Sequence, residues 1–194
     1  MEKYINLLPF TGSKMNSKEN QVLELFYNYP TKNWHFKNLK KEISIADSKL
    51  ASWLKKFQQQ KLIRKIKKEG KMPYYVGNTE DNSFFIKKKL FILKEFLDKG
   101  FIQYLSNLNA DIIIFGSIAK GDWHKESDID IFIYGKIPDA NIFQFESILK
   151  REIQLFNITS KKELKKFNPY LLKNILEGEL ITGNHNFLEV KVNA

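Results

Sequence analysis

The stretch Ile112–Ile133, IIIFGSIAKGDWHKESDIDIFI, decides how the second half of this 194-residue chain folds. It opens within the run DIIIF, residues 111–115, whose continuous apolar character is typical of a short strand buried on both faces. The run ends at Gly116 and Ser117, and the residues SIAKGD that follow predict a single helical turn. Because Gly116 has no side chain, a phosphate could approach its backbone closely, and the Ser117 hydroxyl could donate to that phosphate. Many α/β turns share this pattern, so it does not define a function by itself.

Two carboxylates mark the strand that follows. In SDIDIFIYG, residues 127–135, alternate residues share a face, so Asp128 and Asp130 lie on one side and the isoleucines on the other. Placing two like charges together in an apolar strand is costly unless a cation compensates them. Mg²⁺ is commonly held by one or two carboxylates together with substrate phosphates. The pair therefore predicts a site for Mg²⁺ (or Mn²⁺) beside the Gly-Ser turn.

The segment GSIAKGDWHKESDIDIFI resembles the signature of the DNA polymerase β-type nucleotidyltransferase superfamily. Its compact spacer is similar to that of the minimal nucleotidyltransferases, and the likeness extends from Asp111 to about Asn184. The resemblance implies a nucleotidyltransferase-like mixed β-sheet flanked by helices, a nucleoside triphosphate as substrate, and Mg²⁺ held by Asp128 and Asp130. It also places four residues against the nucleotide: Gly116, Ser117, Lys120 and Ser127. Lys120 could equally be an ordinary solvated side chain.

The third carboxylate of that superfamily is missing from its expected position. The family places an acid on a later strand, as general base and metal ligand, and REIQLFNIT, residues 151–159, is the corresponding strand here. The aligned residue is Gln154, whose amide cannot accept a proton at neutral pH. Glu152 lies two residues earlier, hence on the same face, and could take over the role. Otherwise the chain would bind nucleotide and metal but transfer slowly or not at all.

Nearly all of the positive charge lies in the first 80 residues. Of the net charge of +10, residues 1–80 contribute +9, from 16 Lys and Arg against 7 Asp and Glu, and residues 81–194 contribute +1, from 16 against 15. A basic half-chain favours a polyanionic partner. A general bias toward lysine in the source's proteins would give the same excess without any such partner.

Apolar periodicity in residues 16–79 predicts three helices followed by a lysine-rich hairpin. This order, with SKLASWLKKFQQQKLIRK before the hairpin and YYVGN at its end, resembles small winged helix-turn-helix regulators. The resemblance implies double-stranded DNA as a partner, bound by the third helix and the hairpin. The predicted DNA contacts are Lys49, Ser52, Lys55, Lys56, Arg64, Lys65, Lys67 and Lys68. Winged helices also bind proteins, and a basic helix face can simply be solvated.

These parts together predict an α+β chain with four segments. They are an N-terminal segment (1–15), a winged helix-turn-helix (16–79), one connecting helix (80–106) and a minimal nucleotidyltransferase domain (107–194). In the connecting helix, Lys87, Lys88 and Lys89 are expected to form a solvated face. Cysteine is absent, and no apolar run approaches the roughly 20 residues of a transmembrane helix. We therefore expect a cytoplasmic protein with no membrane partner.

Two functions fit this sequence. The first is a Mg²⁺-dependent transferase that moves NMP, most often AMP from ATP, onto a hydroxyl of a protein, a nucleic acid or a small molecule. Minimal nucleotidyltransferases often modify a toxin, so a protein partner such as a toxin is compatible with this reading. The second is a DNA-binding transcriptional regulator whose degenerate transferase domain binds nucleotide without efficient catalysis. The two functions do not exclude each other.

Overall fold

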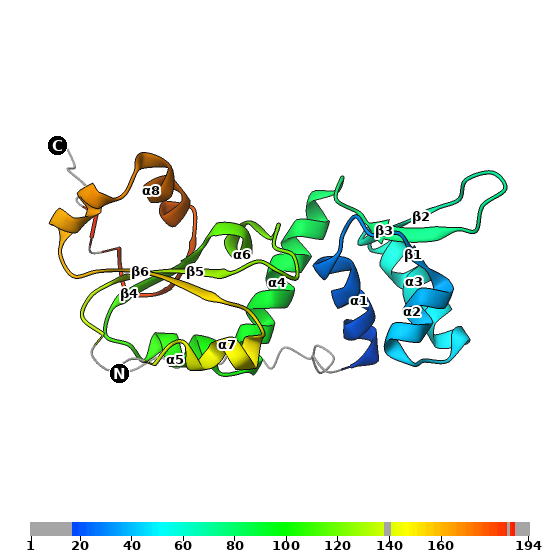
Figure 1. Ribbon diagram of the computed structural model, residues 1–194, viewed down its shortest axis with the longest axis horizontal. Coiled ribbons are helices and arrows are strands. Elements are labelled where there is room, and N and C mark those ends of the chain that lie inside the picture. The colour runs from blue at the N-terminus through cyan, green and yellow to red at the C-terminus, as the bar shows by residue number, and fades with distance from the viewer. Residues whose placement is uncertain (1–16, 138–140, 186, 189–194) are drawn as a thin grey trace, which may run out of the picture.

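The computed structural model describes residues 17–137, 141–185 and 187–188 of the chain. Two parts lie next to each other, an N-terminal part with α1, α2 and α3 and a C-terminal part built on a larger sheet, and α4 runs between them (Figure 1). The mixture of helices and sheets confirms the predicted α+β class. None of the helices in the described ranges is both long and apolar enough to cross a membrane.

The N-terminal part contains three helices and a small antiparallel sheet. The elements are α1 (Lys18–Asn28), β1 (Trp34–His35), α2 (Phe36–Ile43), α3 (Asp47–Gln59), β2 (Ile63–Ile66) and β3 (Tyr74–Gly77), and the sheet order is β1-β3-β2. The predicted order of three helices and a hairpin is confirmed, while the two-residue strand β1 was not predicted. The core is made of side chains from all three helices, from the three strands and from the residue before β2: Val22, Phe26, Trp34, Leu39, Leu50, Leu54, Phe57, Leu62, Ile63 and Tyr75. The assignment of this part to the winged helix-turn-helix class stays a prediction.

The predicted continuous helix from Asn82 to Ser106 is wrong, because the chain turns at Gly100. The segment forms two helices, α4 (Asn82–Asp98) and α5 (Phe101–Ser106). Gly100 joins them with φ of 77°, a left-handed conformation that is costly for residues with a side chain.

Lys88 corrects a second expectation for the same segment. Its side chain is only 1% exposed, so it does not belong to a solvated face. The reason is its spacing along α4, because Phe84, Lys88, Ile92 and Phe96 follow one another at intervals of four residues. Residues four apart share one face of a helix, and this face is the buried one.

The C-terminal part is built on a four-stranded mixed sheet of order β6-β5-β4-β7. Its elements are β4 (Asp111–Phe115), α6 (Gly116–Lys120), β5 (Ile129–Tyr134), α7 (Gln144–Leu149), β6 (Ile153–Ile158), the 3₁₀ helix η1 (Lys161–Lys166), α8 (Pro169–Leu176) and β7 (Glu179–Thr182). β5 and β6 are parallel, and the other neighbouring pairs are antiparallel. This mixed sheet flanked by helices agrees with the fold predicted for residues 107–194.

Both faces of the central strands are covered, as the apolar run before Gly116 predicted. One core contains Ile112 and Ile114 of β4, with the isoleucines of β5 and buried side chains of α4, α5 and α7. A second core, on the other face, contains Ile113 and Phe132 together with residues of β6 and α8. The Gly-Ser turn at the end of β4 is therefore held between two packed layers.

Helix α1 contributes to the cores of both parts. Val22 and Phe26 lie in the N-terminal core, whereas Tyr27, which is 1% exposed, lies in the C-terminal one. The Tyr27 ring centroid is 5.4 Å from that of Phe84 and 6.2 Å from that of Trp123. The N-terminal part is thus packed directly against the loop that follows the Gly-Ser turn.

Candidate functional site

Gly116 lies directly against the carboxylate of Asp130. Phe115, the last residue of β4, pairs with Asp130 of β5, so the first residue of α6 is placed beside that side chain. A Cβ built on Gly116 would collide with Oδ2 of Asp130 and lie 3.1 Å from its Cγ. Gly116 also has φ of 70°. Both its backbone conformation and the space beside it therefore require glycine.

The two aspartates form an unbalanced acidic pair at the start of β5. Asp130 is the second residue of β5, and Asp128 is the residue immediately before β5 begins. Burial, followed by the negative charge of Asp128, raises the pKa of Asp130 above its ordinary value. A bound cation would favour the ionised form instead. Two carboxylates open to a third group suit a hard cation such as Mg²⁺, which completes its shell with phosphate and water oxygens.

Gln154 occupies the third position of this site. In the parallel pairing of β5 with β6, Gln154 is the residue opposite Asp130. Its Nε2 atom donates a hydrogen bond of 2.6 Å to Oδ2 of Asp128. The amide therefore meets the acidic pair at the position where the superfamily resemblance implied a carboxylate. Within the described ranges, there is no group of three His, Cys, Asp or Glu side chains that could hold a metal ion.

Glu152 lies just before β6, and its side chain is exposed. Its backbone carbonyl accepts a hydrogen bond of 2.9 Å from the amide of Ile129, which anchors the start of β5. Its side chain lines a surface cavity of about 460 Å³ next to Asp128. The cavity has a mixed charged lining: Lys125, Glu126, Ser127, Asp128, Glu146, Lys150, Arg151 and Glu152. Glu152 is thus a neighbour of the acidic pair, and its catalytic role stays a prediction.

The other three residues predicted to contact nucleotide are in different surroundings. Ser117 is partly buried as the second residue of α6. Lys120, at the end of the same helix, is exposed, and its Nζ donates a hydrogen bond of 2.9 Å to Oδ1 of Asn174 in α8. The Ser127 hydroxyl accepts a hydrogen bond of 2.8 Å from the amide of His124. Ser127 therefore stabilises the loop before Asp128, whatever its part in nucleotide binding.

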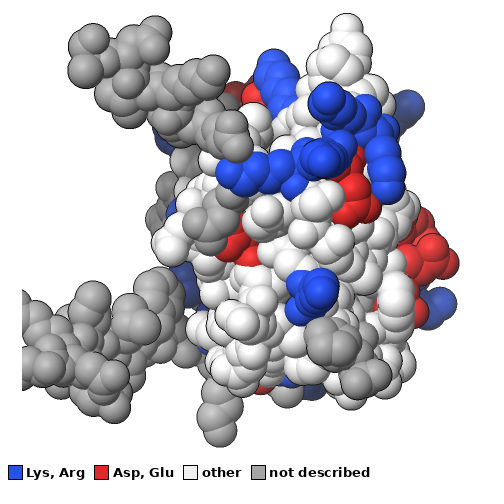
Figure 2. All heavy atoms as spheres, turned by 90° about the vertical axis from the view of Figure 1, so that its left-hand side faces the viewer, with Lys and Arg blue, Asp and Glu red and all other residues white. Residues whose placement is uncertain are grey.

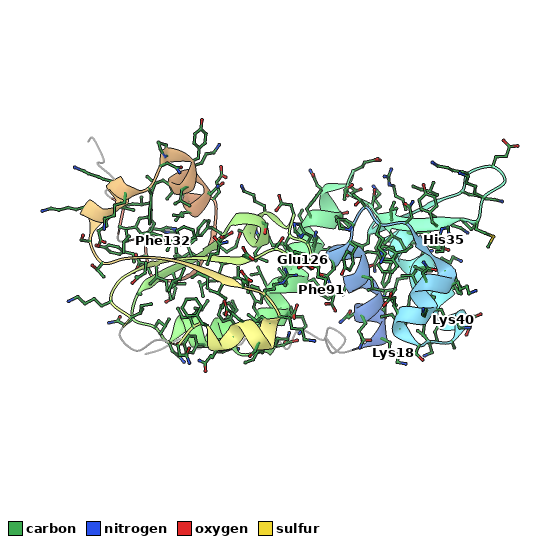
Figure 3. All side chains as sticks on the ribbon, in the orientation of Figure 1. Lys18, His35, Lys40, Phe91, Glu126 and Phe132 are labelled. Carbon is green, nitrogen blue, oxygen red and sulfur yellow. The ribbon has the colours of Figure 1, made fainter. Side chains whose placement is uncertain are left out.

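A buried cationic and aromatic cluster lies beneath that loop, and the sequence reasoning missed it. Trp123 is 1% exposed, with Nζ of Lys88 at 4.7 Å and Cζ of Arg151 at 4.8 Å from its ring centroid. Burial lowers the pKa of Lys88 to about 8, although the nearby carboxylate of Asp122 acts in the opposite direction. Phe91 and Glu126 mark this junction between the two parts (Figure 3). The only sequence signal was the spacing of Lys88 on the apolar face of α4.

The residues predicted to contact DNA lie on α3, β2 and the loop after β2. Seven of them are exposed: Lys49, Ser52, Lys55, Lys56, Lys65, Lys67 and Lys68. Two of the eight are engaged by carboxylates, since Lys56 Nζ lies 2.7 Å from Oε1 of Glu19 and Arg64 Nη1 lies 2.6 Å from Oε2 of Glu80. A hollow of about 890 Å³ is lined by α2 and the turn after it, and three of its residues are lysines that the sequence reasoning left out: Lys37, Lys40 and Lys41. Lysine is therefore spread over α2 as well as α3.

Lysine also gathers at the opposite end of the molecule. Figure 2 looks onto the end that carries η1 and α8, and Lys and Arg side chains lie together in the upper part of this face with a few acids among them. The exposed lysines of these two elements are Lys161, Lys162, Lys165, Lys166 and Lys173. Glu163 lies within this group and pairs with Lys166 at 3.0 Å.

The family of the chain follows from its similarity to known proteins. A family model described as "Nucleotidyltransferase domain" matches residues 92–181. A protein of Methanocaldococcus jannaschii named "Putative protein adenylyltransferase" is 35% identical over 89 residues, which cover 44% of this chain and 88% of that protein. The chain belongs to the nucleotidyltransferase family. No solved structure matches it.

The part that matches the nucleotidyltransferase family contains the whole candidate site. It begins within α4 and ends within β7, so it includes the Gly-Ser turn, the aspartate pair and Gln154. The N-terminal helices α1, α2 and α3 lie before it. The family match therefore supports a nucleotidyl transfer function for the C-terminal part of this nucleotidyltransferase.

Proposed function

We propose that the chain binds a nucleoside triphosphate at the Gly116–Ser117 turn and transfers NMP, AMP from ATP in the first instance, to a hydroxyl acceptor. The observation that carries this proposal is the contact between Gly116 and Asp130, because it brings a side-chain-free backbone and a carboxylate to one point. Adenylyl transfer is the activity named for the M. jannaschii relative. It is the first reaction to test here.

Asp128 and Asp130 are the residues that would hold Mg²⁺ or Mn²⁺. Their oxygen ligands suit either ion, and burial together with the charge of Asp128 raises the pKa of Asp130, an effect that a bound cation would oppose. When bound, the ion neutralises charge on the triphosphate as the leaving group departs. The protein's own contribution would be to orient the nucleotide and to keep the two carboxylates together.

The transfer reaction needs a group that takes the acceptor's proton. The acceptor oxygen bonds to the α-phosphorus, the bond from that phosphorus to the bridging oxygen breaks, and pyrophosphate leaves. The hydroxyl proton must pass to a base, which Gln154 cannot be. We assign this role to Glu152, the exposed carboxylate next to Asp128 in the surface cavity. Because Glu152 lies outside β6, we expect slow transfer.

A second candidate function is that of a DNA-binding regulator that senses nucleotide. It is favoured by the hydrogen bond from Gln154 to Asp128, which places an amide where a transferase would need an acid. In this proposal α3 and the β2–β3 hairpin act as recognition helix and wing of a winged helix-turn-helix on double-stranded DNA. The seven exposed polar and basic residues of these elements support it. A protein partner, such as a toxin, would be an alternative acceptor or ligand.

The experiment that tests transfer uses the full chain with α-³²P-labelled ATP, GTP, CTP or UTP and either Mg²⁺ or Mn²⁺. Self-labelling or pyrophosphate release that is lost in Asp130→Asn would support the transferase proposal. Glu152→Gln tests the assigned base, and Gln154→Asp tests whether a carboxylate at the third position accelerates transfer. If neither the unaltered chain nor Gln154→Asp shows any reaction while nucleotide still binds, the regulator proposal replaces the transferase.

A further inference from the structure

The guanidinium group of Arg151 lies behind the loop that leads to Asp128. Its Nη1 atom donates to the backbone carbonyl of His124 at 2.7 Å and to that of Ser127 at 2.8 Å, with a longer bond of 3.3 Å to that of Lys125. The planar, forked guanidinium can satisfy several acceptors at once in a fixed geometry. Because Ser127 is the residue before Asp128, Arg151 bonds to the peptide group that links Ser127 to a carboxylate residue of the candidate site.

The loop from residue 122 to residue 128 has no regular secondary structure, so its backbone groups are paired by side chains and by turn contacts. Besides Arg151, several contacts hold it, among them a bond of 3.1 Å from the amide of Ser127 to the carbonyl of His124. The Ser127 hydroxyl bonds to the amide of His124, and the amide of Lys125 donates to the carbonyl of Asn28, the last residue of α1, at 3.3 Å. Arg151 is the side chain that joins the two ends of the second half of this loop, because it donates to a backbone carbonyl at each end.

Arg151 is itself fixed by two further partners. Its Nη2 atom donates to Oδ1 of Asn28 at 3.4 Å, and its Cζ atom lies 4.8 Å from the ring centroid of Trp123. Burial lowers the pKa of Arg151, against the effect of nearby carboxylates such as Glu95 and Glu24, but a guanidinium stays charged at neutral pH. Arg151 is partly buried, and its Nη1 donors are directed at the loop carbonyls although carboxylates lie nearby, so holding the loop is the main contact of this group.

We propose that Arg151 is a positioning residue, which holds the loop so that Asp128 lies beside Asp130 when metal and nucleotide bind. This role rests on the proposed nucleotide site. Groups that orient metal ligands from behind typically change metal affinity or activity by about 10- to 100-fold when they are removed. Such groups contact the metal-binding side chain itself, whereas Arg151 contacts the backbone of the loop that carries the metal-binding residue.

The test measures binding of Mn²⁺ and ATP to the full chain by the electron paramagnetic resonance of bound Mn²⁺. Arg151→Gln should raise the Kd of Mn²⁺-ATP by about 10- to 100-fold, because the loop carbonyls lose their common donor. Lys136→Gln is the control. It removes one positive charge from an exposed side chain that does not line this cavity, and it should leave Kd unchanged.

A second variant separates positioning from stability. Arg151→Lys keeps the charge but offers a single ammonium instead of a fork, so it should fold normally and still bind Mn²⁺-ATP more weakly than the unaltered chain. Thermal unfolding of each variant is measured alongside. If either arginine variant lowers the thermal midpoint but binds Mn²⁺-ATP as tightly as the unaltered chain, Arg151 is only structural and the positioning role is overturned. If the unaltered chain does not bind Mn²⁺-ATP, it is the proposed function that fails.

Discussion

Gln154 donates a hydrogen bond of 2.6 Å to Asp128 across the parallel strands β5 and β6. This bond compensates part of the negative charge of the aspartate pair without a metal ion. A carboxylate in the same place would add a third negative charge and would depend on a cation to remain there. The identity of this one residue therefore affects both the stability of the free protein and its dependence on metal.

The first prediction follows from that bond. Gln154→Asp should lower the thermal midpoint of the metal-free chain, because it replaces a donor by a like charge next to Asp128 and Asp130. Addition of Mn²⁺ should raise the midpoint of the variant more than that of the unaltered chain. Differential scanning calorimetry with and without Mn²⁺ checks this. Equal responses to Mn²⁺ in the two proteins would mean that residue 154 does not contribute to ion binding.

The second prediction concerns Gly116. Gly116→Ala should abolish nucleotide binding and cost more than the roughly 1–2 kcal/mol expected for a left-handed alanine, because the new methyl group must displace Asp130. Gly70→Ala is the control, since Gly70 has a similar φ of 65° but no atom within 4 Å of the added Cβ. Urea denaturation of both variants measures the difference. The same loss of stability in both would show that the contact with Asp130 is unimportant.

The third prediction is a pH dependence caused by Lys88. Its pKa falls from 10.5 in the unfolded chain to about 8 in the fold, so between these values the unfolded state binds the proton that the folded state has released. The free energy of unfolding should therefore rise as pH increases from 8 to 10.5, by on the order of 3 kcal/mol at most.

Lys88→Met should remove this rise and should stabilise the chain at pH 7, since the apolar side chain avoids burying a charge. Lys87→Met, at the neighbouring and less buried position, should keep the rise. Urea denaturation at a series of pH values gives both results. A rise that persists in Lys88→Met would assign it to other groups.

The fourth prediction separates two adjacent lysines of α3. Both are exposed, but Lys56 forms an ion pair with Glu19 of α1. On double-stranded DNA, Lys55→Ala should reduce the slope of log affinity against log salt by about 0.9, the value for one phosphate contact. Lys56→Ala should change this slope less, because its charge is already engaged within the protein. Fluorescence anisotropy of labelled duplex DNA at several salt concentrations checks both, and affinity that is independent of salt would refute DNA binding.

The sequence predicted the elements of the site that depend on local pattern. The apolar run before Gly116 and the alternation around Asp128 and Asp130 are strong signals, because a buried strand leaves few other arrangements for such residues. Those two strands and the short helix between them were predicted correctly, whereas the sequence left open whether Gln154 or Glu152 faces the aspartate pair. Whether Glu152 takes part in the chemistry depends on the exact position of its side chain at the start of β6, which a sequence pattern does not indicate.

What the sequence did not predict depends on contacts between distant residues. Arg151 and Asn28 are 123 residues apart, and nothing in either local pattern indicates that they meet. Lys88 looked like part of a solvated run of three lysines, although its four-residue spacing from Phe84 was a signal that could have been read. The break at Gly100 was missed because apolar periodicity continues on both sides of it.

Helix α1 has a consequence for how the molecule unfolds. Because Phe26 and Tyr27, neighbours in one helix, belong to different cores, neither core can lose α1 without opening the other. The described parts should therefore melt in one cooperative transition instead of two. A fragment that starts after residue 80 would expose the aromatic rings that Tyr27 covers, among them Phe84 and Trp123. We therefore expect the part that matches the nucleotidyltransferase family to depend on α1 for its stability, and its proposed activity should be measured with that helix attached.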